Sequence, residues 1–300
     1  MVKTVLLLGG SGFLGTHLAM KLREGYKVFA TYNSHPMQMP GVTYLPLKLH
    51  DEDWVKRMIY TAVPDIVIYA AGSNKLNWAY DNPREAERTN VGGPAAVLKA
   101  AIIFQPRFIY LSSCYVFDGN RGNYHENDIV LANSTLGKYK IAGENFIHGR
   151  SSHYTVMRLA PVFGRGNGGS PSYLDELRLK LDRKQRVEAN PCEFHSFLSI
   201  DSFLELMMRL VDNSPRNKTL HFGGLTKMSH YDFARTFAKR FKYDTNLIIE
   251  KRPPALSASV EAPSVDYSLN CTEIVKTLKI KPLLLEEGFD LLEKQLIASP

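Results

Sequence analysis

The sequence predicts an α/β protein whose core is a doubly wound parallel sheet, followed by a smaller C-terminal α/β region. In the first half of the chain, short apolar runs alternate with segments of helical spacing. The runs lack the polar alternation of half-exposed strands, which is expected when helices cover both faces of a parallel sheet. A glycine-rich turn also follows the first run directly. Such sheets bind ligands at the carboxyl ends of their strands, so the site is expected there.

The individual elements follow from these patterns. Five apolar runs are predicted to form buried strands, and four segments with helical spacing are predicted to connect them through right-handed crossovers. The strands are expected at Val5–Leu8, Val28–Thr31, Ile66–Ala70, Phe108–Leu111 and Thr155–Leu159, and the helices at Leu14–Glu24, Asp53–Ala62, Val91–Phe104 and Lys138–Ile147. Asp51 is expected to cap the second of these helices.

The pattern loosens after Gly164. The composition of Gly164–Pro171 is typical of a flexible loop. Beyond it, a strand is expected near Thr219–Phe222, and helices are expected near Tyr231–Phe241 and Leu285–Leu296. We therefore expect residues 1–165 to form the large sheet domain, with part of 196–222 returning to it, and residues 166–300 to form mainly the smaller region.

The composition, with 44% hydrophobic and 22% charged residues, is that of an ordinary globular protein. The run Val5–Leu8 is too short to cross a bilayer and no cleavage site follows it, so neither a membrane span nor a secretory signal is expected. Three scattered cysteines, Cys114, Cys192 and Cys271, suit reduced thiols in a soluble, cytoplasmic protein. They lack metal-type spacing, and no metal site is expected.

The net charge of +7 is compatible with more than one kind of surface. The densest basic stretch, Arg178–Arg186, alternates leucines with basic residues as a solvated helix does, and no aromatic residues for stacking are interleaved. We therefore expect ordinary surface rather than nucleic-acid binding. Attraction of a small anionic ligand, such as a sugar nucleotide, is the second interpretation.

The turn after the first strand has the spacing of a dinucleotide-binding loop. Its glycines stand at positions 9, 12 and 15. A tight strand-to-helix turn needs a residue that tolerates positive φ, and close approach to a diphosphate needs an absent side chain. The amino end of the helix then offers free N–H groups and a partial positive charge. The predicted contacts are Gly9, Ser11, Gly12, Phe13, Leu14 and Gly15, and a purely structural glycine turn is the alternative.

The tip of the second strand bears on the choice between NADP and NAD. A site for NAD usually places an aspartate or glutamate there to hold the ribose 2′-hydroxyl. The stretch Thr31–His35 contains neither. Asn33 and Ser34 could donate hydrogen bonds to a 2′-phosphate, and Lys48 could add positive charge. NADP is therefore the preferred cofactor, with NAD as the alternative.

Further segments carry a family resemblance. They are Ile68–Gly72, Thr89–Gly93, Leu111–Gly119, Asn123–Asp128, Arg158–Gly164 and Ser229–Ala234. With the glycine loop, they make the chain resemble the extended short-chain dehydrogenases/reductases, in particular the dTDP-4-dehydrorhamnose reductase branch of the NAD-dependent epimerase/dehydratase superfamily. Tyr115–Gly119, which reads YVFDG, is the most specific match. The resemblance implies a Rossmann dinucleotide-binding domain at 1–165 and a mainly substrate-binding region at 166–300.

The resemblance also implies roles for individual residues. In this family a serine or threonine, a tyrosine and a lysine act on a nucleotide-sugar while the nicotinamide exchanges hydride. By position, Ser113 would be the catalytic serine that orients the substrate oxygen, and Lys140 would be the catalytic lysine that also holds the ribose. The other implied dinucleotide contacts are Leu49, Ala70, Ala71, Gly72, Asn90 and Pro161.

The family's tyrosine is absent. The flanking residues from Gly137 to Glu144 fix the alignment, so Leu136 stands where the proton donor is expected. Tyr139 would lie about 300° around the helix and about 4.5 Å along its axis from that position, so it is expected to pack or to face a partner subunit. Tyr44–Lys48 has the same tyrosine–lysine spacing, but it lies in a predicted strand and the match is accidental.

Two other departures concern binding. Lys48 stands where relatives place an aspartate that contacts adenine, and a lysine would repel the adenine amino group. Cys114 replaces the aspartate of the family's STD triplet. It is expected to be a small buried thiol without a base or metal partner.

Three functions are open on the sequence. The first is NADPH-dependent reduction of a nucleotide-linked 4-keto sugar. The second, favoured by the missing tyrosine, is a non-catalytic NAD(P)-binding protein that regulates or supports a protein partner. The third is a sugar-nucleotide epimerase or dehydratase, which would need the same tyrosine. The resemblance further implies a homodimer formed through the helices at Val91–Phe104 and Lys138–Ile147.

Overall fold

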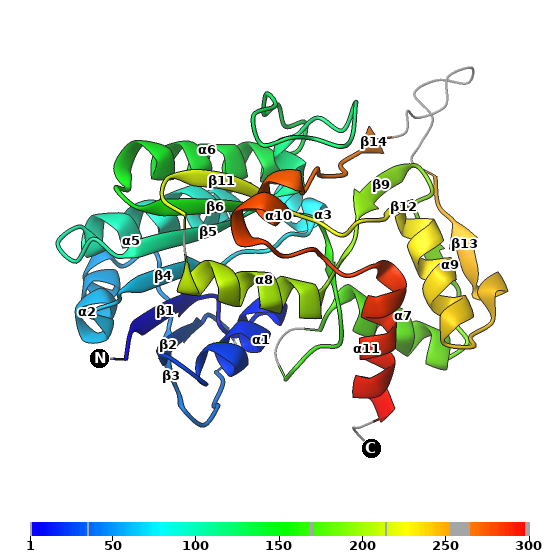
Figure 1. Ribbon diagram of the computed structural model, residues 1–300, viewed down its shortest axis with the longest axis horizontal. Helices are drawn as coiled ribbons and strands as arrows, with labels where there is room; N and C mark the ends of the chain where they lie inside the picture. Colours follow the sequence, from blue (N-terminus) through cyan, green and yellow to red (C-terminus); the bar gives the residue numbers. More distant parts are fainter. Residues whose placement is uncertain (1, 35, 169–170, 214, 253–264, 298–300) are drawn as a thin grey trace.

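The computed structural model describes residues 2–34, 36–168, 171–213, 215–252 and 265–297. Its large sheet consists of β1 (Thr4–Leu8), β2 (Lys27–Tyr32), β3 (Val42–Pro46), β4 (Ile66–Tyr69), β5 (Arg107–Ser113), β6 (Tyr154–Leu159) and β11 (Lys218–Phe222). The order is β11-β6-β5-β4-β1-β2-β3 and every neighbouring pair is parallel (Figure 1). The order reverses between β1 and β4, where a doubly wound sheet leaves a crevice for a ligand. The predicted fold class and strands are confirmed.

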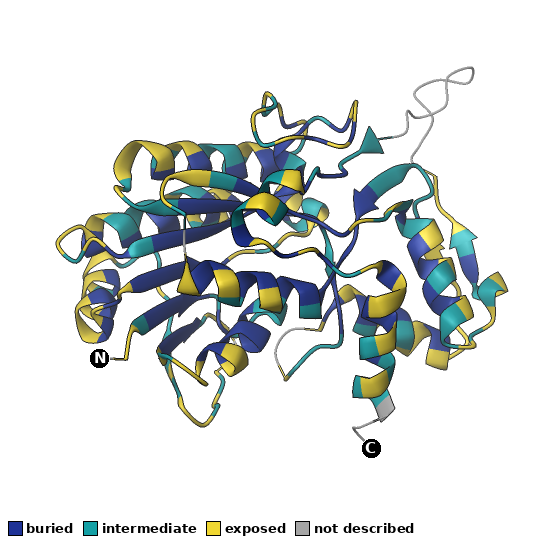
Figure 2. Cartoon of the chain, in the orientation of Figure 1, coloured by how far each residue is buried: buried dark blue, intermediate teal, exposed yellow. Residues whose placement is uncertain are grey.

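Helices cover both faces of this sheet because successive residues of each strand point to opposite sides. Val5 and Leu7 of β1 pack under α1 (Phe13–Leu22), α8 (Ile200–Asp212) and α10 (Thr272–Leu278). Leu6 and Leu8 pack under α2 (Glu52–Ala62), α5 (Gly93–Ala101) and α6 (Thr135–Arg150). Figure 2 shows the central strands buried and the outer faces of the helices exposed.

The predicted helices are confirmed with one change at Val91–Phe104. The chain there makes a π-helical turn, Arg88–Gly92, before α5 begins, and α5 ends at Ala101. Pro94 lies in the first turn of α5, where its missing N–H costs no hydrogen bond. Asp51 caps α2 as predicted, since its side chain accepts a hydrogen bond from the Trp54 N–H at 2.9 Å.

Two short helices, α3 (Leu76–Asp81) and α4 (Pro83–Glu87), are not predicted from the sequence. Each is too short to show an apolar periodicity. The basic stretch Arg178–Arg186 is helical only in its first part, because α7 (Tyr173–Asp182) ends at Asp182. Gly164–Gly168 and Pro171 form no helix or strand, and residues 169–170 of that predicted loop lie outside the described residues.

The smaller region has an apolar cluster of its own, formed mainly by α7, α9 and α11. Its elements are β8 (Val187–Ala189), β9 (Glu193–Ser196), β12 (Lys227–Ser229), α9 (His230–Arg240), β13 (Ile248–Glu250), β14 (Val265–Asp266) and α11 (Leu285–Ile297), and the short pair β7 (Val162–Phe163) and β10 (Leu198–Ser199) joins it to the large sheet. From this half of the chain, α8, β11 and α10 return to the large sheet. The boundary at residue 165 stays a prediction.

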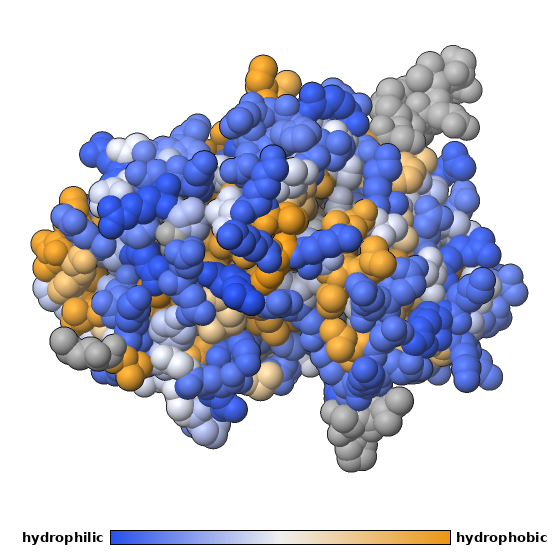
Figure 3. Space-filling model, in the orientation of Figure 1, coloured by the Kyte–Doolittle hydropathy of each residue, from blue (hydrophilic) through white to orange (hydrophobic). Residues whose placement is uncertain are grey.

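The surface shows apolar residues beside the end of α5, where Ile102 and Ile103 are exposed (Figure 3). Among the described helices, none combines the length and the apolar character needed to cross a membrane.

A buried ion pair joins α6 to the sheet. Arg158 of β6 donates from Nη2 to Glu144 Oε2 at 2.8 Å and from Nε to both carboxylate oxygens at 3.2 Å. Ser112 of β5 donates its hydroxyl to the same carboxylate. The side chains of Arg158 and Glu144 are only 6% and 2% exposed, so removal of either one leaves the other charge buried without a counter-ion.

Glu144→Ala should therefore lower the free energy of unfolding by about 3–5 kcal/mol, because the Arg158 guanidinium loses its counter-ion inside the protein. Urea denaturation measures this change. Lys99→Ala is the matched control, since it removes an exposed ion pair with Glu52 and should cost less than about 1 kcal/mol. Equal effects of the two substitutions would contradict the importance of the buried pair.

Candidate functional site

A cavity of about 420 Å³ lies at the point where the strand order reverses. It is bounded by the loop after β1, the ends of β2 and β4, and the π-helical turn before α5. Predicted dinucleotide contacts that line it are Gly9, Ser11, Gly12, Asn33, Ser34, Leu49, Ala70, Ala71 and Gly72. The structure thus brings together residues as far apart in the sequence as Gly9 and Gly72.

The glycines of the loop are required by its geometry. Gly9 has φ +86°, and a Cβ on it would lie 2.7 Å from the backbone of Ala70. Its N–H donates to Thr31 Oγ1 at 2.9 Å, which ties the loop to β2. A Cβ on Gly15 would lie 2.1 Å from the carbonyl oxygen of Gly9, so α1 can begin here only if that side chain is absent.

The amino end of α1 is open toward this cavity. Gly12 is its N-cap residue, and no side chain accepts a hydrogen bond from the first turn. Phe13, Leu14 and Gly15 form that turn. A Cβ on Gly12 would meet only the Gly9 carbonyl oxygen, at 3.4 Å, so the space in front of Gly12 is free of protein atoms. Unpaired N–H groups beside free space are the arrangement that binds a diphosphate.

Seven residues that line the cavity are not among the predicted contacts. They are Leu47, His50, Ser73, Trp78, Glu85, Arg88 and Thr89. Trp78 and Glu85 belong to the short helices that show no periodicity, and Arg88 pairs with Glu85 at 2.9 Å. Lys48 does not line the cavity and its Nζ lies 5.2 Å over the Trp54 ring, so its contribution of charge to a 2′-phosphate stays a prediction.

A second cavity, of about 260 Å³, adjoins the ends of β5 and β6. Both regions of the protein contribute to its wall. The lining includes Asn74, Ser113, Cys114, Pro161, Tyr173, Phe197 and His230. Ser113 Oγ accepts a hydrogen bond from the Tyr115 N–H at 3.3 Å, which fixes the hydroxyl at the end of β5. The predicted residues Ser113 and Pro161 therefore lie together, apart from the glycine loop.

Leu136 lies in a fully apolar environment. It is completely buried beside Ala79 and Ala86, and Trp78 and Tyr139 pack against the same cluster. The helix α6 therefore offers no hydroxyl at this position. Tyr139 packs against this cluster, which is one of the two arrangements predicted for it. It lines neither cavity.

Lys140 and Asn90 also line neither cavity. Lys140 Nζ donates to the carbonyl oxygen of Leu111 at 2.9 Å and lies 5.0 Å over the Tyr110 ring. Burial lowers the pKa of Lys140 to about 8, and the nearby Glu144 opposes this shift. Asn90 donates to Ala86 O at 2.8 Å, while its Oδ1 has no hydrogen-bond partner among the described residues.

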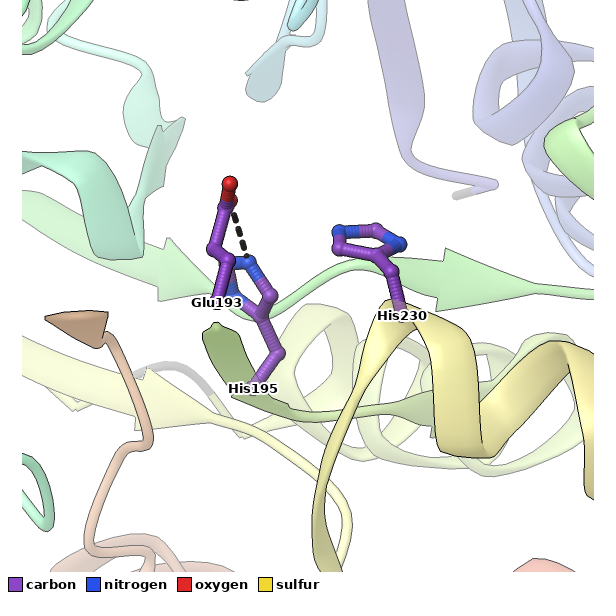
Figure 4. Close-up of side chains that lie close together, drawn as sticks. All are labelled: Glu193, His195 and His230. Atoms are coloured by element: carbon purple, nitrogen blue, oxygen red, sulfur yellow. Dashed lines mark hydrogen bonds and ion pairs between the residues drawn. The ribbon is translucent and has the colours of Figure 1, made fainter. Parts of the chain in front are cut away.

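The prediction that Cys114 has no base as a partner is wrong. Its Sγ lies 3.8 Å from His195 Nδ1, and burial raises the pKa of the thiol to about 12. On the other side of the ring, His195 Nε2 lies 2.8 Å from Glu193 Oε1. His230 stands beside this pair, with a ring-to-ring distance of 5.0 Å to His195 (Figure 4).

Strand pairing brings these side chains together. Glu193 and His195 flank Phe194 in β9 and so point to the same face. Phe194 is paired with Ser229 of β12, which places His230, the next residue, at the level of Glu193. Sequence analysis expects no metal site, yet these three side chains are a possible ligand set. Their contact depends on an antiparallel pairing that no short sequence motif indicates.

The family model for the RmlD substrate binding domain matches residues 3–289. The chain belongs to this family. This RmlD-family chain is 26% identical over 251 residues to methionine adenosyltransferase 2 subunit beta of Rattus norvegicus, covering 80% of this chain and 72% of that protein. It is 25% identical over 237 residues to dTDP-4-dehydrorhamnose reductase of Mycobacterium tuberculosis strain H37Rv, covering 77% and 73%.

A solved structure of dTDP-4-dehydrorhamnose reductase from Bacillus anthracis strain Ames, in complex with NADP, matches the RmlD-family chain with a TM-score of 0.84 at 18% identity. The match covers 98% of this chain and 100% of that one. At this identity the match supports the fold. Together with the family model, it confirms the predicted resemblance to the dTDP-4-dehydrorhamnose reductases.

The buried lysine of this RmlD-family site should make stability depend on pH. The pKa of Lys140 is about 8 in the folded protein and about 10.5 in the unfolded chain, so between these values the unfolded chain binds the proton more tightly. The free energy of unfolding should therefore rise from pH 8 to pH 10.5, by about 3 kcal/mol relative to Lys140→Met.

Urea denaturation at several pH values measures this difference. Lys138→Met is the matched control, because Lys138 is exposed on the same helix and its loss should leave the rise in place. A parallel pH dependence in the wild type and Lys140→Met would show that Lys140 does not titrate in this range.

Proposed function

We propose that this chain binds NADP, or alternatively NAD, across the two cavities and acts as a reductase of a nucleotide-linked keto sugar. The observation that carries the proposal is the uncapped amino end of α1 behind a glycine loop, facing free space. The family supports it, since this chain is similar to dTDP-4-dehydrorhamnose reductases.

The residues present fit a dinucleotide in a defined order. Ser11, Phe13 and Leu14 would hold the diphosphate through backbone N–H groups, while Gly9 and Gly12 would let it approach the backbone closely. Asn33 and Ser34 stand at the end of β2 and would donate to a 2′-phosphate, which is the basis for preferring NADP. Further lining residues, Leu49, Ala70, Ala71 and Gly72, would contact the adenosine, and Pro161 would contact the nicotinamide. The bound dinucleotide would supply hydride.

The chain's own residues give an incomplete proton-transfer set. The Ser113 hydroxyl would orient a substrate oxygen in the second cavity. Leu136 has no proton to give, and Lys140 is held by the Leu111 carbonyl inside the protein. Loss of a general acid typically lowers a rate by about 10²–10⁴-fold. We therefore expect tyrosine-independent and correspondingly slow turnover.

A second function is favoured by the same two residues. A protein that keeps its nucleotide cavity, lacks the tyrosine of its relatives and holds its lysine, Lys140, inside the protein suits a regulatory or scaffold role toward a protein partner. The similarity to methionine adenosyltransferase 2 subunit beta supports this alternative. Dinucleotide binding without any turnover would favour it over the reductase. An epimerase or dehydratase would need the same tyrosine and gains no support from the site.

A homodimer and a cytoplasmic location complete the proposal. The dimer would use α5 and α6, as the resemblance implies. Cys114, Cys192 and Cys271 are free thiols, which suits a reducing compartment.

Gly12→Ala tests the dinucleotide site. The added methyl group would occupy the space that a diphosphate needs, so the affinity for NADP should fall by at least about tenfold, or about 1.4 kcal/mol. Titration calorimetry with NADP and NAD measures the affinity. Gly12 has φ −77°, which alanine adopts readily, so the free energy of unfolding should change by no more than about 1 kcal/mol.

Gly25→Ala is the control, because a Cβ there meets no atom within 4 Å. It should leave NADP binding unchanged. If the wild-type chain binds neither nucleotide, the proposed function is refuted.

Leu136→Tyr tests the missing proton donor. The hydroxyl should raise the rate of NADPH oxidation with dTDP-4-keto-6-deoxy sugars by about 10²–10⁴-fold if it reaches the cavity. The larger side chain should cost about 1–3 kcal/mol of stability, since Leu136 is fully buried. Leu136→Phe is the matched control, with the same ring and no hydroxyl, and should gain no rate.

Measurable turnover by the wild type supports the reductase. A silent wild type beside an active Leu136→Tyr would refute reductase activity in the natural protein and leave the binding role.

A further inference from the structure

Three side chains with metal-binding atoms, Glu193, His195 and His230, lie close together (Figure 4), and His230 also lines the second cavity. One ligand atom from each of Glu193, His195 and His230 lies within 4.8 Å of the other two. Glu193 Oε1 and His195 Nε2 are already 2.8 Å apart. Ligands of a tetrahedral Zn²⁺ ion lie about 2.0–2.2 Å from it, and so roughly 3.3 Å from one another. A side-chain movement of His230 by no more than about 1.5 Å would therefore bring its nitrogen to this separation.

His230 has a free nitrogen. Its ring contacts Tyr173, His195 and Phe197, but it makes no hydrogen bond to any described residue. An imidazole nitrogen without another partner has a lone pair that can bind a metal ion.

The other two ligands are oriented for the same task. Glu193 Oε1 lies 2.8 Å from His195 Nε2, so the two ligand atoms already face the same point. Tyr115 also donates its hydroxyl to Glu193 Oε1 at 3.1 Å. Beyond the ring of His195, Cys114 Sγ faces Nδ1 and can accept its N–H. An outer partner of this kind fixes the ring of a metal-binding histidine.

We propose that Glu193, His195 and His230 bind a divalent transition-metal ion of the Zn²⁺ type. Two imidazole nitrogens and one carboxylate oxygen are the ligands of zinc sites that keep a fourth position open. Mg²⁺ and Ca²⁺ prefer all-oxygen sites, so this set excludes them as the preferred ions. The inference does not depend on dinucleotide binding.

The location gives the ion access to a ligand. His230 lines the same cavity as Ser113, so the open coordination position would face a small molecule bound in that cavity. A carbonyl or hydroxyl oxygen is the group that would complete the coordination. An ion in this place would polarise a substrate oxygen in the cavity. Its ligands come from β9 and α9, whereas Leu136 of α6 offers no hydroxyl.

The test uses the full chain, stripped of metal with a chelator. Calorimetry with Zn²⁺ should show one equivalent bound per chain, and Co²⁺ should give visible absorption bands of a site with low coordination number. Glu193→Gln and His230→Ala should each weaken Zn²⁺ binding by at least about 100-fold. Mg²⁺ should not compete.

His125→Ala is the matched control, because His125 is an exposed histidine outside the cluster and its loss should leave binding unchanged. Circular dichroism checks that each variant folds, and His195 is left intact because it is completely buried. No stoichiometric binding by the wild type, undiminished binding by both cluster variants, or competition by Mg²⁺ would overturn the proposal. A separate NADP titration tells this failure from failure of the proposed function.

Discussion

The carboxylate of Glu144 fixes α6 on the sheet, and with it the positions of Leu136 and Lys140. Arg158 and Ser112 hold the carboxylate from two neighbouring strands. Gly143 permits the close approach, since a Cβ there would lie 2.3 Å from the Asn90 carbonyl oxygen. With α6 in this position, Leu136 is enclosed by α3 and α4. A single buried charge pair thus holds the helix that carries Leu136 and Lys140.

The sheet and the glycine loop could be predicted because they depend on local patterns. Apolar runs form buried strands. Asp51 caps α2 by accepting a hydrogen bond from the Trp54 N–H, only three residues further along the chain. Features that depend on distant contacts could not be predicted. The side chain of Lys48 turns to Trp54 instead of to the cavity, and the cluster at His195 depends on the pairing of β9 with β12. No spacing along the chain carries that information.

The two cavities differ in what they require of the sequence. The first is formed largely by backbone and small residues at strand ends, so few changes of side chain can abolish it. The second is formed by side chains from both regions, including Ser113, Tyr173 and His230. Chemistry at the second cavity can therefore change while the first one stays intact. This explains how a family can share one fold and one nucleotide cavity yet differ in what its members do.

The path of the chain after residue 165 also limits how the protein can be divided. The strand β11 pairs only with β6 at the outer edge of the large sheet, and α8 covers residues beneath it. A fragment that ended before them would present the bare N–H and C=O groups of β6 to other molecules. Such edges recruit strands from neighbouring chains. The smaller region therefore cannot be replaced as an independent unit, because any replacement must also supply β11.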